Sequence, residues 1–335
     1  MKDIEFISSG VLTTIQDLGR RRWRNMGVPL SGAADPESSA LANALMGKNI
    51  NSPVLESTFV GPKFKLHTSQ NIVLVGAIME LKIDGISVPH KTVITADSGS
   101  IVEIGRATHG CRSYLAFTDN IIGADFLGSV STYLPSKLGG LKGRMIQKGD
   151  FISLEKNDYK EDYQEAIETS QQANYSHSWL IRVTEGPEYD LLSTSSKDEI
   201  ENNQYLVDKD SDRMGVRLNG SPLKIDEHGD MISSPMFPGT IQCPANGQPI
   251  MLGPDAQTLG GYPRILQAAK IDRALIGQLR PGDQLRFKKI SLQEAGELWR
   301  DKAISFPIIS HISVSYTHLR AHETDSYLVC RLLLE

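Results

Sequence analysis

Cysteine is scarce in this sequence, and its positions follow no pairing pattern. The 335 residues contain three cysteines, Cys111, Cys243 and Cys330, and no two of them form a C-x-x-C pair. Such spacing supports neither a disulfide framework nor a thiolate zinc site. We therefore expect a protein of a reducing compartment, the cytoplasm.

Long apolar runs and an excess of positive charge are also missing. The N-terminal stretch MKDIEFISSGVLTTIQDLG lacks the apolar region of a signal peptide. No run approaches the roughly 18 apolar residues that a membrane helix requires. The net charge of −5 argues against a basic surface for nucleic acid or an anionic membrane. The sequence predicts a soluble protein with neither partner.

Several catalytic and cofactor motifs are absent as well. The sequence has no G-x-x-x-x-G-K-[ST] phosphate loop, no H-E-x-x-H zinc motif and no G-x-S-x-G nucleophile elbow. Five histidines show no ligand spacing and are typical of surface or strand positions: His67, His90, His109, His177 and His228. We therefore expect no metal in this chain. An Ala-Met-Lys-Met biotinylation sequence is missing too, so any biotin carrier must come from another chain.

What the sequence does contain is a mainly β pattern in two blocks. The composition, 40% apolar and 22% charged, allows a sizeable core. Short strand-like segments separated by turns fill residues 54–154 and resume at 179. This pattern predicts a sandwich or barrel and argues against a Rossmann sheet. Both blocks end in a turn followed by an alternating strand, at 148–154 and 281–287, which suggests two related barrels.

These signals predict the domain boundaries. We expect a first domain at 1–154, a polar linker or insertion at 155–178 and a second domain at 179–295, followed by a tail. From about residue 306 the tail resembles the translated read-through of a sequencing adapter. We therefore interpret it as non-native sequence. Four of its residues are excluded from the candidate sites: His311, His318, His322 and Cys330.

One helix is predicted near residues 36–46. Asp35 followed by Pro36 is a strong helix start, and Gly47 supplies a stop. The helix begins just after Ser31, so its N-terminal amides could face an anion there. A capped surface helix that docks on a sheet fits the same residues.

The stretch 242–263, QCPANGQPIMLGPDAQTLGGYP, is the strongest candidate for a binding loop. Its amide side chains offer donors and acceptors that match a planar amide, urea, lactam or carboxylate, and its glycines allow close approach of the backbone. Asp255 could accept a hydrogen bond from an N–H group while Gln257 fixes the same planar group. On its own, the stretch also fits an ordinary β-turn region.

Arginines supply candidate anion sites. Arg213 and Arg217 could share a face and clamp a carboxylate or carboxyl-phosphate, although surface salt bridges to Asp210 and Asp212 fit equally. Arg20, in the basic run RRRWR, could hold a carboxylate or phosphate, or belong to a solvated face.

A further polar segment offers hydroxyl groups. It contains Ser129, Ser131 and Thr132 beside paired glycines. These residues fit either a binding loop or a plain surface loop.

Five separated motifs stand out in the sequence. They are QDLGR (16–20), GVPLSGAADPESSALAN (27–43), SDRMGVRLNG (211–220), PGTIQCPANGQPIMLGPDAQTLGGYP (238–263) and RPGDQLRF (280–287). Together they resemble the biotin-dependent carboxyltransferase family, which includes proteins described as allophanate hydrolase subunit 2, KipA or the C subunit of 5-oxoprolinase. The resemblance covers roughly residues 4–295, and two positions depart from the pattern, with Arg22 at an expected Gly and Cys243 at a usual Val.

The resemblance implies two cyclophilin-like β-barrel domains with a site between them. Some relatives move a carboxyl group from carboxybiotin to urea. Others work with a KipI-like B subunit, together with an A subunit, in the ATP-dependent opening of 5-oxoproline, and a third description is a regulator that binds a kinase inhibitor. We favour the C subunit of 5-oxoprolinase, because the chain has no carboxylase or biotin carrier domain. ATP would then be bound by the complex, and carboxybiotin is expected only in the carboxyltransferase alternative.

Chemistry and motif position together predict the site residues. The catalytic candidates are Asp255 and Gln257. The predicted substrate-binding residues are Gln242, Thr258, Tyr262, Ser31, Asp35, Arg213, Arg217 and Arg20.

Overall fold

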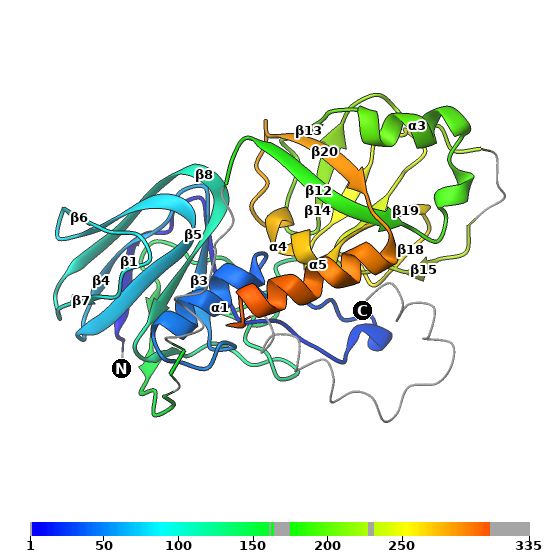
Figure 1. Ribbon diagram of the computed structural model, residues 1–335. Helices are drawn as coiled ribbons and strands as arrows, with labels where there is room; N and C mark the ends of the chain where they lie inside the picture. Colours follow the sequence, from blue (N-terminus) through cyan, green and yellow to red (C-terminus); the bar gives the residue numbers. More distant parts are fainter. Residues whose placement is uncertain (1, 161, 164–174, 227–230, 309–335) are drawn as a thin grey trace. The chain divides into compact units, whose positions relative to one another are not determined.

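The computed structural model shows a mainly β protein made of two compact units (Figure 1). It describes residues 2–160, 162–163, 175–226 and 231–308. The first unit holds residues 2–23, 30–160, 162–163, 175 and 306–308, and the second holds 24–29, 176–226 and 231–305.

A nine-stranded antiparallel sheet, curled into a half-barrel, forms the first unit. Its main path runs β10-β1-β4-β8-β3-β2, and β5 adds β6 and β7 to the sheet by pairing with β8. The strands are β1 (Ile4–Ser8), β2 (Leu12–Gln16), β3 (Val54–Thr58), β4 (Lys63–Leu66), β5 (Gln70–Ile83), β6 (Ile86–Val88), β7 (Ile94–Ala96), β8 (Ile101–Phe117) and β10 (Phe151–Ile152). A separate pair is formed by β9 (Asn120–Ile121) and β11 (Leu154–Glu155).

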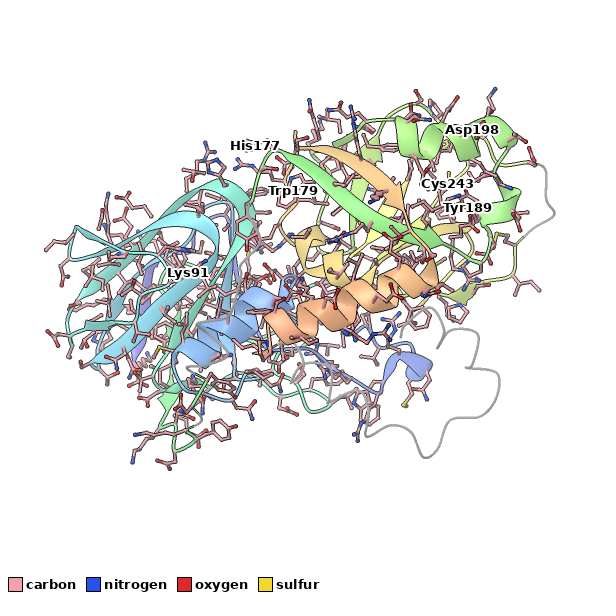
Figure 2. All side chains as sticks on the ribbon, in the orientation of Figure 1. Lys91, His177, Trp179, Tyr189, Asp198 and Cys243 are labelled. Carbon is pink, nitrogen blue, oxygen red and sulfur yellow. The ribbon has the colours of Figure 1, made fainter. Side chains whose placement is uncertain are left out.

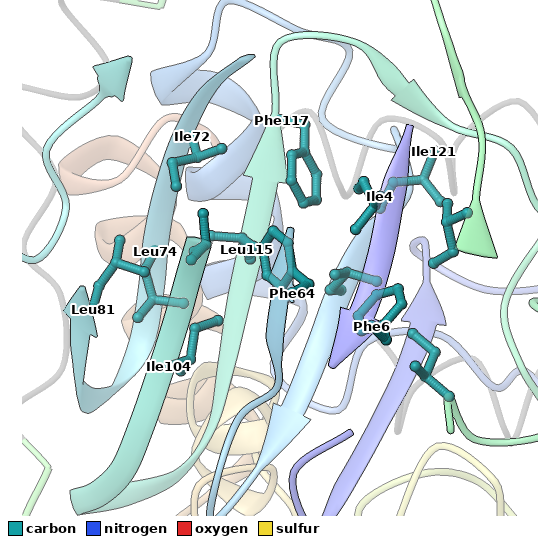
Figure 3. Packing of buried hydrophobic residues seen from close by; sticks show 14 of the residues in the cluster. Ile4, Phe6, Phe64, Ile72, Leu74, Leu81, Ile104, Leu115, Phe117 and Ile121 are labelled. Atoms are coloured by element: carbon teal, nitrogen blue, oxygen red, sulfur yellow. The ribbon is translucent and has the colours of Figure 1, made fainter. Parts of the chain in front are cut away.

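The core of the first unit lies on one face of this sheet (Figure 3). Strand β4 alternates between half-buried and buried positions, as the period of two requires. The rings of Phe6, Phe64 and Phe117 lie in succession there, with centroid distances of 5.6 and 6.0 Å. Such tilted aromatic contacts add to the free energy gained by burying apolar surface.

Helix α1 (Pro36–Leu45) packs against β5 and β8. The Asp35 carboxylate caps it by accepting from the Ser38 amide at 3.0 Å and the Ser38 hydroxyl at 2.7 Å. Gly47, at φ +64°, follows its end. The predicted helix is confirmed, and it ends one residue earlier than expected.

The second unit contains a closed barrel with the order β12-β19-β16-β17-β14-β13-β20. Its strands are β12 (Ser178–Glu185), β13 (Tyr205–Val207), β14 (Gly215–Asn219), β16 (Thr240–Gln242), β17 (Ile250–Leu252), β19 (Arg264–Ala268) and β20 (Gln284–Lys289). A short pair outside the barrel is formed by β15 (Ser234–Pro235) and β18 (Leu259–Gly260). The helical elements are η1 (Arg24–Met26), η2 (Tyr189–Leu191), α3 (Thr194–Asn202), η3 (Lys270–Asp272), α4 (Arg273–Ile276) and α5 (Leu292–Ser305).

The repeated turn of the sequence has the same backbone geometry in both units. The Asp150 amide donates to the Gln147 carbonyl at 3.1 Å, and the Asp283 amide donates to the Arg280 carbonyl at 3.0 Å. Each carboxylate in return accepts from the amide of the same partner, at 2.8 and 3.1 Å.

The aspartate of the second turn also anchors the start of the barrel. His177 and Trp179 (Figure 2) both contact its carboxylate, at 2.9 and 2.7 Å. The turn of the second unit is therefore tied to β12 through side chains.

The predicted mainly β architecture is confirmed, with one difference between the halves. The expected barrel is closed in the second unit, whereas the end strands β10 and β2 of the first unit do not pair with each other in the described residues. Closure depends on which strand edges meet, and neither alternation nor turn spacing reports that.

Some of the predicted domain boundaries fall in or next to residues that the structure does not describe. The linker 155–178 lies partly outside the described residues, and β12 begins at its last position. Helix α5 continues past the domain end predicted at 295. The predicted non-native tail from 309 onward, with its three histidines and Cys330, lies outside the described residues. Among the residues that are described, no helix is long and apolar enough to cross a membrane.

Candidate functional site

Gln242 is a buried amide on one strand of the closed barrel. It ends β16, and its neighbour Ile241 is fully buried on the opposite face of the strand. In the register Gln242 lies between Ile250 of β17 and Arg264 of β19. Its side chain is 4% exposed, and its Oε1 atom accepts no hydrogen bond from any described residue. This oxygen is an acceptor that a ligand N–H group could satisfy.

A second glutamine behaves differently: Gln267 pairs with Thr240 in the register and so shares the face of Gln242. Gln267 accepts from the Thr240 hydroxyl at 2.8 Å and donates to the Pro238 carbonyl at 3.3 Å. Buried polar groups are normally satisfied in this way, because an unmade hydrogen bond costs about 1–3 kcal/mol. The unsatisfied oxygen of Gln242 is therefore not a general property of this face.

Asp255 and Arg213 form a buried ion pair beside Gln242's strand partners. Arg213 Nε donates to one carboxylate oxygen at 2.8 Å and Nη2 to the other at 3.0 Å, and both residues are 5% exposed or less. The Asp255 amide also donates to the Arg213 carbonyl at 3.1 Å. The pair thus fixes the loop that begins at Gly253 against the chain that enters β14.

This geometry corrects the expected clamp of two arginines. Arg213 is engaged by Asp255, whereas Arg217 is exposed on β14. The expected face shared by Arg213 and Arg217 is absent because Arg213 precedes the strand and turns inward. Both oxygens of Asp255 are likewise held by Arg213, so the carboxylate supports the loop in this conformation.

The remaining candidates of the second unit lie along the loop after Asp255. Gln257 and Thr258 are half-buried, and Tyr262 is 49% exposed. The Thr258 carbonyl accepts from the Met236 amide at 2.9 Å, which joins this loop to the segment before β16.

A second ion pair supports the same segment. Arg264 donates to the Glu188 carboxylate at 2.8 and 2.6 Å and to the Pro235 carbonyl at 2.9 Å. Arg24 donates to the Met236 carbonyl, and its guanidinium lies over the Phe237 ring at 5.1 Å. The chain around Gln242 is therefore held in place from several sides.

In the first unit, Asp17 organises a buried polar loop. Its carboxylate accepts from the amides of Gly19 and Val130, at 2.7 and 2.8 Å, and from the hydroxyls of Ser129 and Ser131, at 2.7 and 2.5 Å. Both serines are buried. The alternative of a plain surface loop is therefore wrong for this segment.

Arg20 is part of the same buried arrangement. It is 1% exposed, Nε donates to the Phe126 carbonyl at 3.1 Å, and Nη2 donates to the Ser131 carbonyl. The guanidinium also lies 5.6 Å from the centre of the Phe126 ring. These contacts contradict the alternative of a solvated basic face at Arg20.

Ser31 and Asp35 lie on the loop that enters α1, and both are buried. Ser31 has a φ of +55°, and its hydroxyl donates to the Thr132 carbonyl at 3.2 Å. Asp35 caps α1, and its amide donates to the Tyr114 hydroxyl at 2.7 Å. The carboxylate of Asp35 thus occupies the place where an anion at the helix N-terminus was considered.

Burial shifts the pKa values of two groups near these loops. The pKa of the Cys243 thiol is raised to about 11 by desolvation, so Cys243 (Figure 2) stays protonated and poorly reactive at neutral pH. Burial first, then the charges of Glu56 and Asp35, raises the pKa of Tyr114 well above its ordinary value. Tyr114 therefore stays a neutral hydrogen-bonding group.

Gln16 is a buried amide that the site prediction omitted. It ends β2, and its Oε1 atom has no hydrogen-bond partner among the described residues. A signal for it was available, because Thr-Ile-Gln occurs at 14–16 and again at 240–242.

The predicted residues fall into two groups, one in each unit. The first unit contains Arg20, Ser31 and Asp35, and the second contains Arg213, Arg217, Gln242, Asp255, Gln257, Thr258 and Tyr262. Within the described ranges, no group of three or more His, Cys, Asp or Glu residues could hold a metal ion.

The fold and these loops define a carboxyltransferase domain. The family described as carboxyltransferase domain, subdomain A and B, matches residues 26–289, so the chain belongs to this family. The family resemblance of the five motifs is therefore confirmed.

Particular relatives fall into two kinds. The chain is 35% identical to the 5-oxoprolinase C subunit of Escherichia coli (strain K12), over 89% of this chain and 95% of the relative. The protein of the same name from Haemophilus influenzae is 32% identical over 89% of this chain and 95% of that relative. The urea amidolyase of Saccharomyces cerevisiae is 30% identical over 97% of this chain, which spans 18% of the relative.

Solved structures show the same fold. The K. lactis urea amidolyase matches 91% of this chain with a TM-score of 0.84 and 29% identity, and this chain spans 20% of its length. The protein TTHA0988 matches 86% of this chain with a TM-score of 0.75 and 25% identity, and this chain spans 55% of it.

Proposed function

We propose that this chain is the C subunit of an ATP-dependent 5-oxoprolinase. It works in the cytoplasm with a KipI-like B subunit, together with an A subunit, to open the lactam of 5-oxoproline to glutamate. Two relatives of that name match along 95% of their own lengths, which supports this assignment over that of a part of a urea amidolyase. We assign ATP to the complex as a whole rather than to this chain, whose sequence has no G-x-x-x-x-G-K-[ST] phosphate loop.

The reaction needs a planar, poorly reactive C–N bond to be held and polarised. Opening breaks the ring C–N bond, water supplies an oxygen to the carbonyl carbon and a proton to the departing nitrogen, and ATP hydrolysis to ADP and phosphate supplies the free energy. A protein contributes by orienting the lactam and by placing hydrogen-bond groups where charge develops.

The unsatisfied oxygen of Gln242 is the observation that carries the proposal for the second unit. It accepts the lactam N–H, which fixes the ring in one orientation. Gln257 and Thr258 bind the rest of the planar group, and Tyr262 borders it. Asp255 acts through Arg213 by holding the loop in place.

The other predicted residues take supporting roles in this proposal. Arg217 is exposed and meets the anionic group of an activated intermediate. Arg20, Ser31 and Asp35 hold the loops of the first unit in their binding conformation.

The test is reconstitution from the three purified proteins. Mixing this chain with the A and B subunits should give ATP hydrolysis that depends on 5-oxoproline and on this chain. Gln242→Met, which keeps the size of the side chain, should lower that rate at least about tenfold, since it removes a hydrogen bond to a buried acceptor. Arg286→Met, at an exposed position of β20, is the matched control. Lack of activity in a mixture of the three folded proteins would refute the proposal.

A second candidate is a carboxyltransferase that acts on a urea-like acceptor. The fold match to the K. lactis urea amidolyase, with a TM-score of 0.84, favours it. Carboxybiotin would then supply the carboxyl group from a carrier on another chain, and the buried Gln242 oxygen would accept an N–H of the acceptor. Turnover of urea that does not depend on added carboxybiotin would remove this candidate.

A further inference from the structure

We infer a second ligand-binding subsite, in the first unit at the end of β2, where Gln16 accepts a hydrogen bond from a planar N–H group. The starting observation is the sequence Thr-Ile-Gln, which closes β2 at 14–16 and β16 at 240–242. Each copy lies in a different unit of the protein. The recurrence suggests a feature that is present once in each unit.

The two copies have the same side-chain arrangement. Ile15 and Ile241 are both buried, Ile15 in the core of the first unit, so Gln16 and Gln242 lie on the opposite face of their strands. Gln16 is fully buried. In both glutamines the Oε1 atom has no hydrogen-bond partner among the described residues.

The orientation of the Gln16 amide is fixed by its neighbours. Its Nε2 atom donates to the Thr132 carbonyl at 3.1 Å and to the Thr14 hydroxyl at 3.0 Å. A carbonyl oxygen can only accept, so rotating the amide by half a turn would place two acceptors together. The unsatisfied oxygen therefore cannot be exchanged for the nitrogen.

Other groups around Gln16 converge on the same carbonyl. The Ser31 hydroxyl donates to the Thr132 carbonyl at 3.2 Å, next to the bond from Gln16. Ser31 is held at a φ of +55°, a conformation that costs an L-residue about 1–2 kcal/mol. Backbone strain of this kind concentrates at ligand sites, where the surrounding structure maintains it.

The chemistry of the open acceptor selects the ligand. An amide oxygen with no internal donor needs an N–H or O–H group, and a planar lactam, amide or cyclic urea supplies an N–H. A carboxylate or phosphate without such a donor would leave the oxygen unsatisfied. A reaction between a substrate that carries an N–H group and an activated second reactant requires two binding subsites. The inference rests on the proposed function in one respect, the choice of 5-oxoproline as a probe.

The experiment measures ligand stoichiometry on the whole chain. Equilibrium dialysis with 5-oxoproline and with the cyclic urea imidazolidin-2-one should give two ligands per chain. Gln16→Met and Gln242→Met should each reduce this to one. The lactone isostere of 5-oxoproline, with oxygen in place of the ring N–H, should bind about tenfold more weakly or worse.

The matched control is Gln70→Met in the first unit. Gln70 is buried too, but both of its amide atoms are bonded to Asp119, at 2.8 and 3.1 Å. It should retain two ligands. If Gln16→Met does not fold, a crystal structure of the unaltered chain soaked with imidazolidin-2-one replaces it, and a ligand N–H on Gln16 Oε1 is expected.

Several outcomes would overturn the inference. The unaltered chain could bind one ligand, and Gln16→Met could leave that number unchanged. The lactam and the lactone could bind with equal affinity, or neither N–H probe could bind. In the soaked crystal, a water could remain hydrogen-bonded to Gln16 Oε1 in place of the ligand. An active reconstituted complex with one ligand per chain would defeat this inference alone. An inactive complex whose chain still binds two N–H ligands would defeat the proposed function alone.

Discussion

Replacing Asp255 with Asn should destabilise the second unit by about 3–5 kcal/mol. The reason is that the Arg213 guanidinium would stay buried and charged while it loses the ionised carboxylate that accepts its two hydrogen bonds. Both residues are almost fully buried, and two hydrogen bonds of 2.8 and 3.0 Å join them, so solvent screening is slight. Arg213→Met should cost a similar amount, because it removes the same two hydrogen bonds from a buried carboxylate.

The double variant carries the sharper expectation. Removing both charges should cost less than the sum of the single changes, with a coupling free energy of about 1–3 kcal/mol. The assay is urea unfolding followed by fluorescence, since Trp179 and Trp299 report on the second unit. Arg286→Met, at an exposed position, should change the free energy of unfolding by no more than about 0.5 kcal/mol.

One result would refute the reasoning about the ion pair. If Asp255→Asn stays within about 0.5 kcal/mol of the unaltered chain, Arg213 does not depend on this carboxylate. Asp255 would then be available for direct chemistry on the substrate. Additive single and double variants would lead to the same conclusion.

Three further predictions follow from backbone geometry and burial. Arg22 has a φ of +78°, which strains a residue other than glycine. Arg22→Gly should therefore raise the free energy of unfolding, measured by denaturant titration, by about 0.5–1 kcal/mol, because the relief of strain exceeds the effect of a more flexible unfolded chain. Unchanged or lower stability would contradict this. Gly32→Ala should destabilise the first unit by about 2 kcal/mol or more in the same assay, since its Cβ would lie 2.8 Å from the Gly19 amide nitrogen at a φ of +86°; a neutral effect would show that the two loops can separate. Burial lowers the pKa of Lys48 from 10.5 to about 8, so between these pH values the unfolded chain holds a proton that the folded chain has released. The stability of the unaltered chain relative to Lys48→Met should therefore rise with pH across this window, by about 1.4 kcal/mol per unit at most; the opposing effect of Tyr114 above pH 10 cancels in this difference, and a flat difference would contradict the shift.

The features that the sequence predicted are those encoded locally. Asp35, Pro36 and Gly47 lie within a few residues of the helix ends that they specify, and α1 follows them closely. The repeated turns at Asp150 and Asp283 are also local, because each bond joins residues three positions apart. Such signals need no knowledge of the tertiary fold. The glycine expected at position 22 has a local reason as well, because Arg22 has a positive φ of +78°, which glycine adopts without strain.

The features that the sequence did not predict depend on distant partners. Arg213 and Asp255 are 42 positions apart, and Gln16 and Thr132 are 116 apart. A charged or polar residue in a motif looks the same whether it meets a ligand or a buried partner. The predicted roles of Arg20 and Asp255 therefore rest on chemistry and motif position, and their protein contacts could be seen only in the folded chain.

Buried glutamines in this protein differ in whether protein groups satisfy their amide oxygens, and this difference bears on ligand binding. Gln70 and Gln267 show that this fold can bury a glutamine and satisfy both ends of its amide with protein groups. Gln16 and Gln242 each keep one acceptor open, at a cost of about 1–3 kcal/mol to the ligand-free protein. A ligand that supplies an N–H removes this cost and therefore binds with a lower Kd; at a hundredfold excess over that Kd it should stabilise the folded state by about 2.7 kcal/mol. A ligand of the same shape without the N–H has a higher Kd, so it should stabilise the folded state less at the same concentration. The open acceptors therefore favour the bound state by raising the free energy of the ligand-free one, and they discriminate against ligands that have no donor at this position.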